Sequence, residues 1–195
     1  MENKLSNIQL ENIQQILTLR YSKHLLDSNQ RLNYKNFKNL KIDTPENFIE
    51  TSITKTIAGE LDQNHKKVGI SLSSGIDSTL ILALLRREFP SIEIESISVK
   101  FSDSIDETEN SKKISEKFQT NHQILEIDNF LEELPKAISI VKQPFWDLHW
   151  YYLVKKMKNF TNIFLSGDGG DELFGGYTFR YKKFLGQKQD HVKLT

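Results

Sequence analysis

Short β-prone segments alternate with helical segments along the middle of this chain, and this alternation restricts the possible folds more than any other feature. Apolar, β-branched runs predict strands, and segments with apolar residues at helical spacing predict the helices between them. The expected strands cover residues 68–72, 94–101, 122–127 and 162–166, and the expected helices cover residues 77–89, 107–118, 130–141 and 148–158. Such a series is typical of an α/β fold, a parallel sheet flanked by helices on both faces.

The region before this series is predicted to begin with a helix, followed by a segment that is either a linker or an extended stretch that leans on a neighbour. It combines an amphipathic helix that begins near Ser6 with a polar stretch rich in Asn and Lys. A better-marked helix follows, with Thr44 as its expected N-cap and Pro45 at its first position. We therefore divide the chain into residues 1–43, a helix with a linker, and residues 44–195, one domain of ordinary size.

Composition excludes several classes of function. Lys and Arg together number 26, as do Asp and Glu, so no net charge draws the molecule to nucleic acid or to an anionic membrane. The chain has no cysteine, which excludes disulfides, zinc thiolate sites and a cysteine nucleophile. No apolar run approaches the ~20 residues that span a bilayer. We expect a cytoplasmic protein with neither a nucleic-acid nor a membrane partner.

The first chemical motif directly follows the expected strand at residues 68–72. Residues 73–78 read Ser-Ser-Gly-Ile-Asp-Ser and open an apolar helix. Small side chains let a backbone approach a bound group, and a helix amino terminus directs N–H groups at it, so this loop suits a phosphate. Asp77 would repel a bare phosphate, and we assign it to a metal ion such as Mg²⁺. The alternative is an ordinary tight turn in which Asp77 caps the helix.

The second motif follows the last expected strand. Residues 166–177 read Ser-Gly-Asp-Gly-Gly-Asp-Glu-Leu-Phe-Gly-Gly-Tyr, and this run holds five of the nine glycines. We interpret its first half as a loop in which glycines allow positive φ, while Asp168, Asp171 and Glu172 offer metal ligands or a general base. The alternative is a calcium-type surface loop or a glycine-rich turn with exposed acids, although EF-hand spacing is absent.

Both motifs lie where ligands bind in open α/β sheets, at the carboxyl ends of strands. If the first and fourth strands are neighbours, Asp77 and Asp171 converge, and nucleotide-bound Mg²⁺ would satisfy both loops. An aromatic group follows Pro144 and either lines a pocket or fills a helix core; it comprises Phe145, Trp146, Trp150, Tyr151 and Tyr152.

The first motif resembles the S-G-G-x-D-S signature of the PP-loop ATP pyrophosphatases, with Ser74 in place of the second glycine. Residues 166–177 resemble the second signature of one branch, the synthetase domain of asparagine synthetase and its relative β-lactam synthetase. Residues 19–21, 106–107 and 120–122 also fall where this family has comparable residues. The resemblance implies an adenine-nucleotide alpha-hydrolase-like, Rossmann-like fold.

The resemblance also implies roles for single residues. It implies that ATP or pyrophosphate is bound by Leu72, Ser73, Ser74, Gly75, Asp77, Ser78, Val99, Ser166, Gly167 and Gly169. Asp77 and Asp171 would bind Mg²⁺. Asp168 is the expected catalytic residue, at a position where the family often has glutamate and where proton handling near the acyl group is assigned.

The implied reaction uses ATP, Mg²⁺, an aspartate-like amino acid and ammonia. The substrate carboxylate would be adenylated with release of pyrophosphate, and ammonia would then attack the acyl-adenylate. Complete members of the family begin with a glutaminase domain that has an amino-terminal cysteine, which this chain lacks, so a glutaminase domain or subunit is an expected partner. The family also continues beyond the second signature, in a region that supplies a catalytic lysine.

Three readings of function follow from these departures. The first is a synthetase completed by another chain or by further sequence, acting on aspartate or, like β-lactam synthetase, on another substrate. The second is a nucleotide-binding module or inactive fragment without turnover of its own. The third is another PP-loop enzyme, such as an NAD or GMP synthetase or a tRNA-modifying ligase, which residues 166–177 and the lack of a basic stripe disfavour.

Overall fold

The computed structural model describes Gln14 and residues 41–61, 65–101, 106, 108–129, 131–141, 149–178 and 182. The helix predicted near Ser6, almost all of residues 1–43, and two of the aromatic residues, Phe145 and Trp146, lie outside the described part. The account below therefore concerns the α/β region. None of the helices described there is long and apolar enough to cross a membrane.

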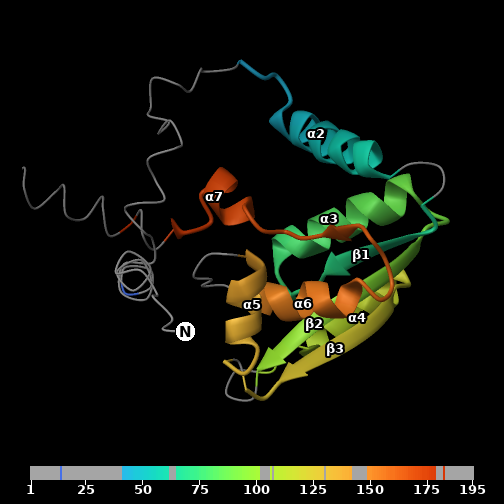
Figure 1. Ribbon diagram of the computed structural model, residues 1–195. Coiled ribbons are helices and arrows are strands. Elements are labelled where there is room, and N and C mark those ends of the chain that lie inside the picture. Colours follow the sequence, from blue (N-terminus) through green and yellow to red (C-terminus); the bar gives the residue numbers. More distant parts are fainter. Residues whose placement is uncertain are drawn as a thin grey trace, which may run out of the picture.

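Four parallel strands form one sheet in the order β3-β2-β1-β4. The strands are β1 (Lys67–Ser71), β2 (Glu93–Phe101), β3 (Asn121–Ile127) and β4 (Phe164–Leu165) (Figure 1). The chain builds outwards from β1 to β3 and then returns to the other side of β1, where β4 pairs with it. The expectation that the first and fourth strands are neighbours is confirmed, and the switch in strand order lies between them.

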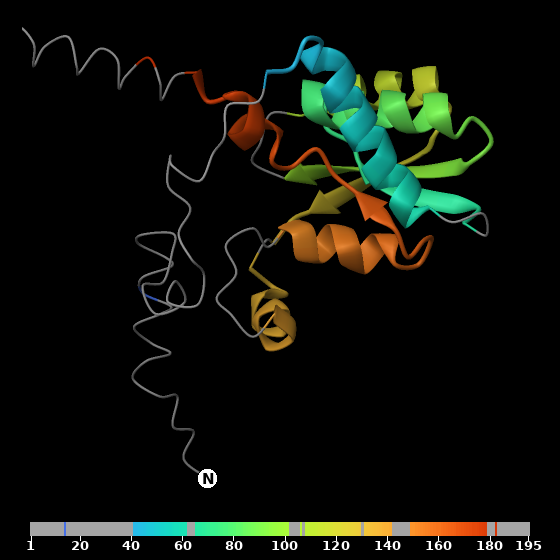
Figure 2. The same cartoon turned by 90° about the horizontal axis from the view of Figure 1, so that it is seen from above.

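Helices cover both faces of the sheet, as the alternation predicts (Figure 2). On one face lie α3 (Ile76–Glu88) and α4 (Thr108–Phe118), and α2 (Pro45–Glu60) packs against α3. On the other face lies α6 (His149–Met157), with α5 (Leu134–Val141) beside it. The α/β prediction is confirmed.

The central strand β1 divides its side chains between two cores. Val68 and Ile70 are fully buried among the side chains of α2 and α3. Gly69 faces the opposite way, because successive residues of a strand point to opposite faces. A Cβ atom at Gly69 would lie 2.8 Å from Cε of Met157 and 2.9 Å from Cδ2 of Phe164. The glycine therefore allows α6 to approach the sheet, where Met157 packs with Ile97.

Three element predictions differ from the structure. The helix predicted over 130–141 begins only at Leu134. Pro135 fits in its first turn, because the N–H that proline lacks would have no partner within the helix at that position. The strand predicted over 162–166 pairs only at Phe164–Leu165. Residues 170–174, the first three of them interpreted as loop, form the short helix α7 (Gly170–Phe174) between two glycines with positive φ, 92° at Gly169 and 71° at Gly175. Positive φ is expected at the glycines of this motif. At Gly169 and Gly175 it begins and ends a short helix, instead of occurring within a loop.

Candidate nucleotide-binding site

The first loop is closed on itself by two serine hydroxyls. The Ser73 N–H donates to Ser78 Oγ at 3.1 Å, and that hydroxyl donates back to the Ser73 carbonyl at 3.1 Å. The Ser73 and Ser78 hydroxyls lie 2.9 Å apart, and the Gly75 N–H donates to Ser73 Oγ at 3.1 Å. These bonds curl the backbone between strand β1 and helix α3 into a small concave turn.

Helix α3 begins directly from this turn. Gly75 occupies the N-cap position, and no side chain caps the helix. Asp77 lies in the first turn, so the alternative in which Asp77 acts as a helix cap is not what the structure shows. An uncapped amino terminus leaves N–H dipoles available to an anionic ligand, and Asp77 is held beside them.

The second loop packs against the first turn of α3. A Cβ atom at Gly167 would lie 2.6 Å from the backbone nitrogen of Ser78, and one at Gly170 would lie 2.5 Å from Cγ of Asp77. Both separations are too short for any side chain. The glycines of the second motif therefore bring its backbone into contact with the first motif, and the Asp77 carboxylate lies against the start of α7.

The two loops enclose a cavity of about 280 Å³ at the carboxyl edge of β1. Seven predicted site residues line it: Ser73, Gly75, Asp77, Ser78, Val99, Gly167 and Asp168. Asp77 and Asp168 bring two carboxylates, and no Lys or Arg is among the described residues that line the cavity. A polyphosphate would therefore be repelled here unless a cation accompanied it.

The other predicted site residues lie outside this lining. The Leu72 side chain is buried in the core, and its N–H and carbonyl are bonded to Ile97 and Ser98 of β2. Ser74 is half-buried in the first loop, and Gly169 provides the positive φ before α7. Ser166 accepts a hydrogen bond from the Asp168 N–H at 3.3 Å, which shapes the second loop, and it lines a separate cavity between α2, α3 and β4.

The two predicted metal ligands are placed differently. Asp77 lines the cavity, whereas Asp171 is exposed and its Oδ1 lies where a side chain at Gly176 would have to be. Among the described residues no cluster of three or more His, Asp or Glu side chains has a metal-binding arrangement. The donor chemistry still suits Mg²⁺, because this ion takes one or two carboxylates and completes its shell with phosphate oxygens and water.

Helix α6 contributes residues from outside the two motifs, and of these only Trp150 was among the sequence candidates for a pocket. His149, Trp150 and Leu153 line the cavity, as does Ser71. A signal for His149 and Trp150 was available, because a helix that leads into a parallel strand runs antiparallel to it and begins at the carboxyl edge of the sheet. Trp150 also packs edge-on against Phe164, with ring centroids 6.0 Å apart.

The predicted aromatic group is thus divided within the described residues. Trp150 lies at the cavity, but Tyr151 and Tyr152 turn towards the start of α5. The Tyr151 hydroxyl donates to Glu133 Oε2 at 3.1 Å, and burial together with this bond raises the pKa of Tyr151. Only the first of these three rings can contact a ligand in the cavity.

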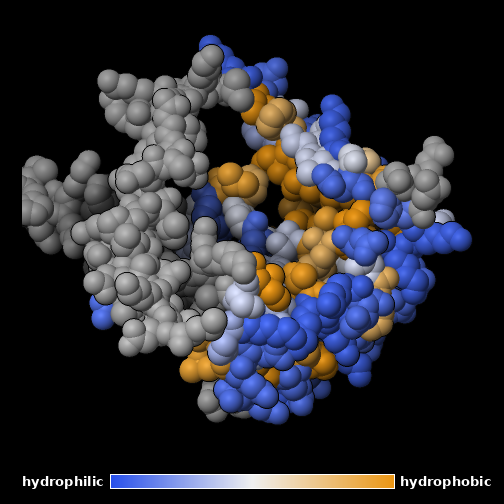
Figure 3. Space-filling view, in the orientation of Figure 1, coloured by the Kyte–Doolittle hydropathy of each residue, from blue (hydrophilic) through white to orange (hydrophobic). Residues whose placement is uncertain are grey.

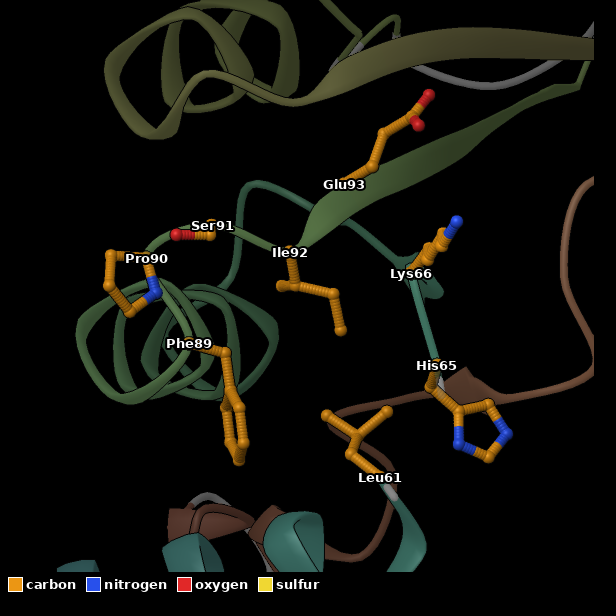
Figure 4. A pocket seen from close by; sticks show the side chains of 8 residues that line it. All are labelled: Leu61, His65, Lys66, Phe89, Pro90, Ser91, Ile92 and Glu93. Atoms are coloured by element: carbon orange, nitrogen blue, oxygen red, sulfur yellow. The ribbon is translucent and has the colours of Figure 1, made fainter. Parts of the chain in front are cut away.

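A larger cavity, of about 600 Å³, lies at the opposite edge of the sheet (Figure 4). It is lined near the amino ends of β1 and β2 by residues such as Lys66, Phe89 and Glu93. No predicted site residue lines it. Because ligands of open α/β sheets bind at the carboxyl ends of strands, the smaller cavity between the two motifs is the better candidate despite its size.

A family model described as asparagine synthase matches residues 49–194. The chain belongs to the asparagine synthase family. It is 35% identical over 115 residues to the Methanocaldococcus jannaschii protein named "Putative asparagine synthetase [glutamine-hydrolyzing] 2", covering 56% of this chain and 22% of that protein. It is 29% identical over 126 residues to asparagine synthetase [glutamine-hydrolyzing] 1 of Bacillus subtilis, covering 62% of this chain and 20% of that protein.

This asparagine synthase family member thus spans about a fifth of the length of these relatives. A similar fold is found in the glutamine-dependent NAD⁺ synthetase from Acinetobacter baumannii, solved in complex with ADP. The TM-score is 0.50 at 16% sequence identity, over 75% of this chain and 31% of that one. The likeness agrees with the Rossmann-like fold expected for the chain.

Proposed function

We propose that this chain carries the ATP-binding, carboxylate-adenylating part of an asparagine synthetase, with ammonia attacking the acyl-adenylate to form an amide. The observation that carries the proposal is the convergence of the two motifs. Loops that are about ninety residues apart in sequence meet in one cavity, which holds the serine turn, the uncapped start of α3 and two carboxylates. The names of the curated relatives agree with this activity.

The proposed binding roles follow the placement of each residue. The turn formed by residues 73–78 would hold the ATP phosphates, with Ser166 and Gly169 shaping the facing loop. Val99 and Gly167 would contact the nucleoside. Leu72 is assigned the same role, but its side chain is buried and its N–H and carbonyl are bonded to β2. The cavity is small for a whole nucleotide, since ligand pockets usually measure about 300–1,000 Å³, so it suits the polyphosphate part.

The proposed cofactor is Mg²⁺, held by Asp77 at the cavity and by Asp171 with the phosphate oxygens. A bound Mg²⁺ would offset the negative charge that develops on the pyrophosphate leaving group. Asp77 itself would orient the polyphosphate through that ion. The absence of Lys and Arg from the described lining makes such a cation necessary for a polyanion to bind.

The proposed reaction has two steps. A substrate carboxylate oxygen attacks the α-phosphorus, and the bond from that phosphorus to the oxygen bridging to the β-phosphorus breaks, so pyrophosphate leaves. Ammonia then attacks the acyl carbon, AMP leaves, and one proton must be removed from nitrogen. Asp168, exposed at the mouth of the cavity, is the proposed acceptor of that proton. A glutaminase domain or subunit would supply the ammonia.

The test is exchange of labelled pyrophosphate into ATP with Mg²⁺, measured with and without aspartate. We expect aspartate-dependent exchange, reduced about 100-fold in Asp77→Asn, because a lost transition-state contact of this kind typically has that effect. Asp43→Asn, at an exposed position before α2, is the matched control and should exchange normally.

Binding of ATP is measured separately through tryptophan fluorescence in a Trp146→Phe variant, which leaves Trp150 at the cavity as the reporter. Binding without any exchange would contradict adenylation by this chain and favour a nucleotide-binding module. Absence of both binding and exchange would contradict the nucleotide site itself.

A further inference from the structure

A buried hydroxyl makes a hydrogen bond at the end of β1 that the backbone of β2 would ordinarily make. The register of the two strands pairs Ser71 with Ile97, so Leu72 and Ser98 come next in line. In a parallel sheet a residue at such a position donates its N–H to one residue of the neighbouring strand and accepts an N–H from two residues further on. Leu72 makes the first of these bonds, donating its N–H to the Ile97 carbonyl at 2.9 Å.

The second bond comes from a side chain. The register would bring the Val99 N–H to the Leu72 carbonyl, but within the described part of the chain that bond is not formed. Instead the Ser98 hydroxyl donates to this carbonyl at 2.5 Å. Ser98 is 5% exposed, and its single hydrogen is used in this bond. The Leu72 carbonyl therefore turns towards the face of the sheet that carries the Ser98 side chain, and the chain leaves β1 here for the turn at residues 73–78.

This change of donor leaves the Val99 N–H without an acceptor among the described residues. Successive residues of a strand direct their N–H and carbonyl groups to opposite neighbouring strands. Since the Ile97 carbonyl is bonded to Leu72, Val99, two residues further on, also directs its N–H to the β1 side.

The unpaired N–H belongs to a residue of the candidate nucleotide site. Val99 is half-buried and lines the cavity at the carboxyl edge of β1, on the side to which its N–H is directed. Nearly all N–H groups inside a sheet are hydrogen-bonded, so one that is left unpaired beside a cavity is a donor for a ligand. Ser98 is not among the described residues that line the cavity, and any effect it has there must pass through its neighbours.

We propose that Ser98 is a positioning residue for the nucleotide site: its hydroxyl replaces the Val99 N–H on the Leu72 carbonyl, so that the first loop leaves the sheet and the Val99 N–H remains a donor for the ligand. The acceptor would be an oxygen or a ring nitrogen of the nucleotide, and this part rests on the function proposed above. The replacement of one donor by the other does not, because it concerns the protein without nucleotide.

The first test needs neither a variant nor nucleotide. Hydrogen exchange of single amides, followed by NMR and corrected for intrinsic rates, should be at least about tenfold faster at Val99 than at Ile97. Ile97 is the matched comparison, because it lies in the same strand and pairs with β1. An equally protected Val99 amide would overturn the proposal, since its N–H would then already have an acceptor.

Ser98→Ala should reverse this pattern. Without the hydroxyl, the register brings the Val99 N–H to the Leu72 carbonyl, so Val99 exchange should slow to about the rate of Ile97. Ser98→Thr keeps a hydroxyl at this position and should exchange as the parent protein does. Fast exchange at Val99 in Ser98→Ala would contradict the replacement of one donor by the other. Should Ser98→Ala fail to fold, the comparison of Val99 with Ile97 in the parent protein still decides.

The second test separates positioning from stability. We expect the Kd for Mg-ATP to rise about five- to tenfold in Ser98→Ala, the effect of one hydrogen bond, and to stay unchanged in Ser98→Thr. Ser96→Ala is the control, because Ser96 is buried two residues earlier on the same face of β2 and is bonded to Thr120. It should lower the melting temperature at least as much as Ser98→Ala without changing the Kd or Val99 exchange. An affinity that follows the melting temperature across these variants would contradict a positioning role.

Adding Mg-ATP to the parent protein provides the third measurement, and it should slow exchange at Val99 because the nucleotide then accepts that N–H. If ATP bound without protecting Val99, the proposal would fail while the proposed function stood. If the parent protein did not bind ATP at all, the proposed function would fail, whereas Val99 exchange in the parent protein and in Ser98→Ala would still decide which group holds the Leu72 carbonyl.

Discussion

At the scale of single residues, the two motifs can touch because glycines, which have a hydrogen atom in place of a side chain, stand at the points of contact. Gly167 and Gly170 touch the first turn of α3 so closely that even a methyl group would displace backbone or the Asp77 carboxylate. Gly59 in α2 is the opposite case, because nothing lies within 4 Å of its missing Cβ. Two glycines of one chain are therefore predicted to respond in opposite ways to the same substitution.

Gly167→Ala should lower the free energy of unfolding by about 1–3 kcal/mol, the usual effect of overpacking, and should weaken ATP binding. Gly59→Ala should raise it by about 0.5–1 kcal/mol, because alanine is the better helix former. Chemical denaturation measures the free energy of unfolding of both variants, and nucleotide titration measures the ATP affinity of Gly167→Ala. Unchanged stability and unchanged ATP affinity in Gly167→Ala would mean that the loops are not in contact.

At the scale of elements, an ion pair and a hydrogen bond connect α6 to the residue just before α5. Lys155 on α6 forms an ion pair with Glu133, the residue before α5, and Tyr151 donates a hydrogen bond to the same carboxylate. The bond to Lys155 is the main cause that lowers the pKa of Glu133. Since a lowered pKa in the folded state favours the ionised form, this attachment contributes stability above the ordinary glutamate pKa and loses it as pH falls through the folded value.

The attachment of α5 should therefore weaken below pH 4.5, the ordinary value for this carboxyl group. Hydrogen exchange of residues 134–141 should accelerate there in the parent protein, whereas Glu133→Gln should exchange rapidly already at neutral pH and change less on acidification. Glu132→Gln, at the exposed neighbouring position, is the control. Equal acid dependence in Glu133→Gln and the parent would show that another group is responsible.

At the scale of the whole molecule, an exposed apolar surface accompanies the absence of net charge. Three apolar side chains on this surface are largely exposed: Ile76 at the start of α3 (82%), and Leu173 (79%) and Phe174 (58%) in α7. Figure 3 shows apolar side chains on the same face at α7 and along α2 and α3. Near the isoelectric point of about 7.0, electrostatic repulsion between molecules is at its weakest, so apolar surfaces can associate.

Solubility should accordingly pass through a minimum near pH 7, and Leu173→Gln should raise it there. Because the Leu173 side chain is already exposed, its replacement should change the free energy of unfolding by no more than about 0.5 kcal/mol. Light scattering between pH 5 and 9 measures the effect. Ile124→Gln on β3 is the comparison, and an equal gain there would show that the surface around α7 has no special role.

Most of this architecture could be predicted from the sequence, because the spacing of apolar residues and the turn residues between them are local properties that indicate strands and helices. The strands, the helices on both faces and the place of the two loops are confirmed. The roles assigned to residues such as Asp77 and Asp168 remain predictions, although the structure brings both to one cavity. His149 was not predicted, and Trp150 was predicted at a pocket only as one of two alternatives, because the place of both depends on the direction of α6 across the sheet. Asp171 could not be oriented from sequence, because Gly176 provides the space that its carboxylate occupies.

The pairing of β4 with β1 has a consequence for how the site comes into being. The Thr161 hydroxyl reaches the Lys67 carbonyl across 94 residues of chain, and only two residues of β4 pair with β1. Closing so long a loop for so few contacts is slow, because the entropy is lost before the contacts form. During synthesis on a ribosome we therefore expect the first motif to gain its partner loop only after residues beyond Gly170 have emerged. We therefore expect the half of the cavity that carries Asp77 to form first, and the proposed nucleotide site to be complete only after the second motif has been synthesised.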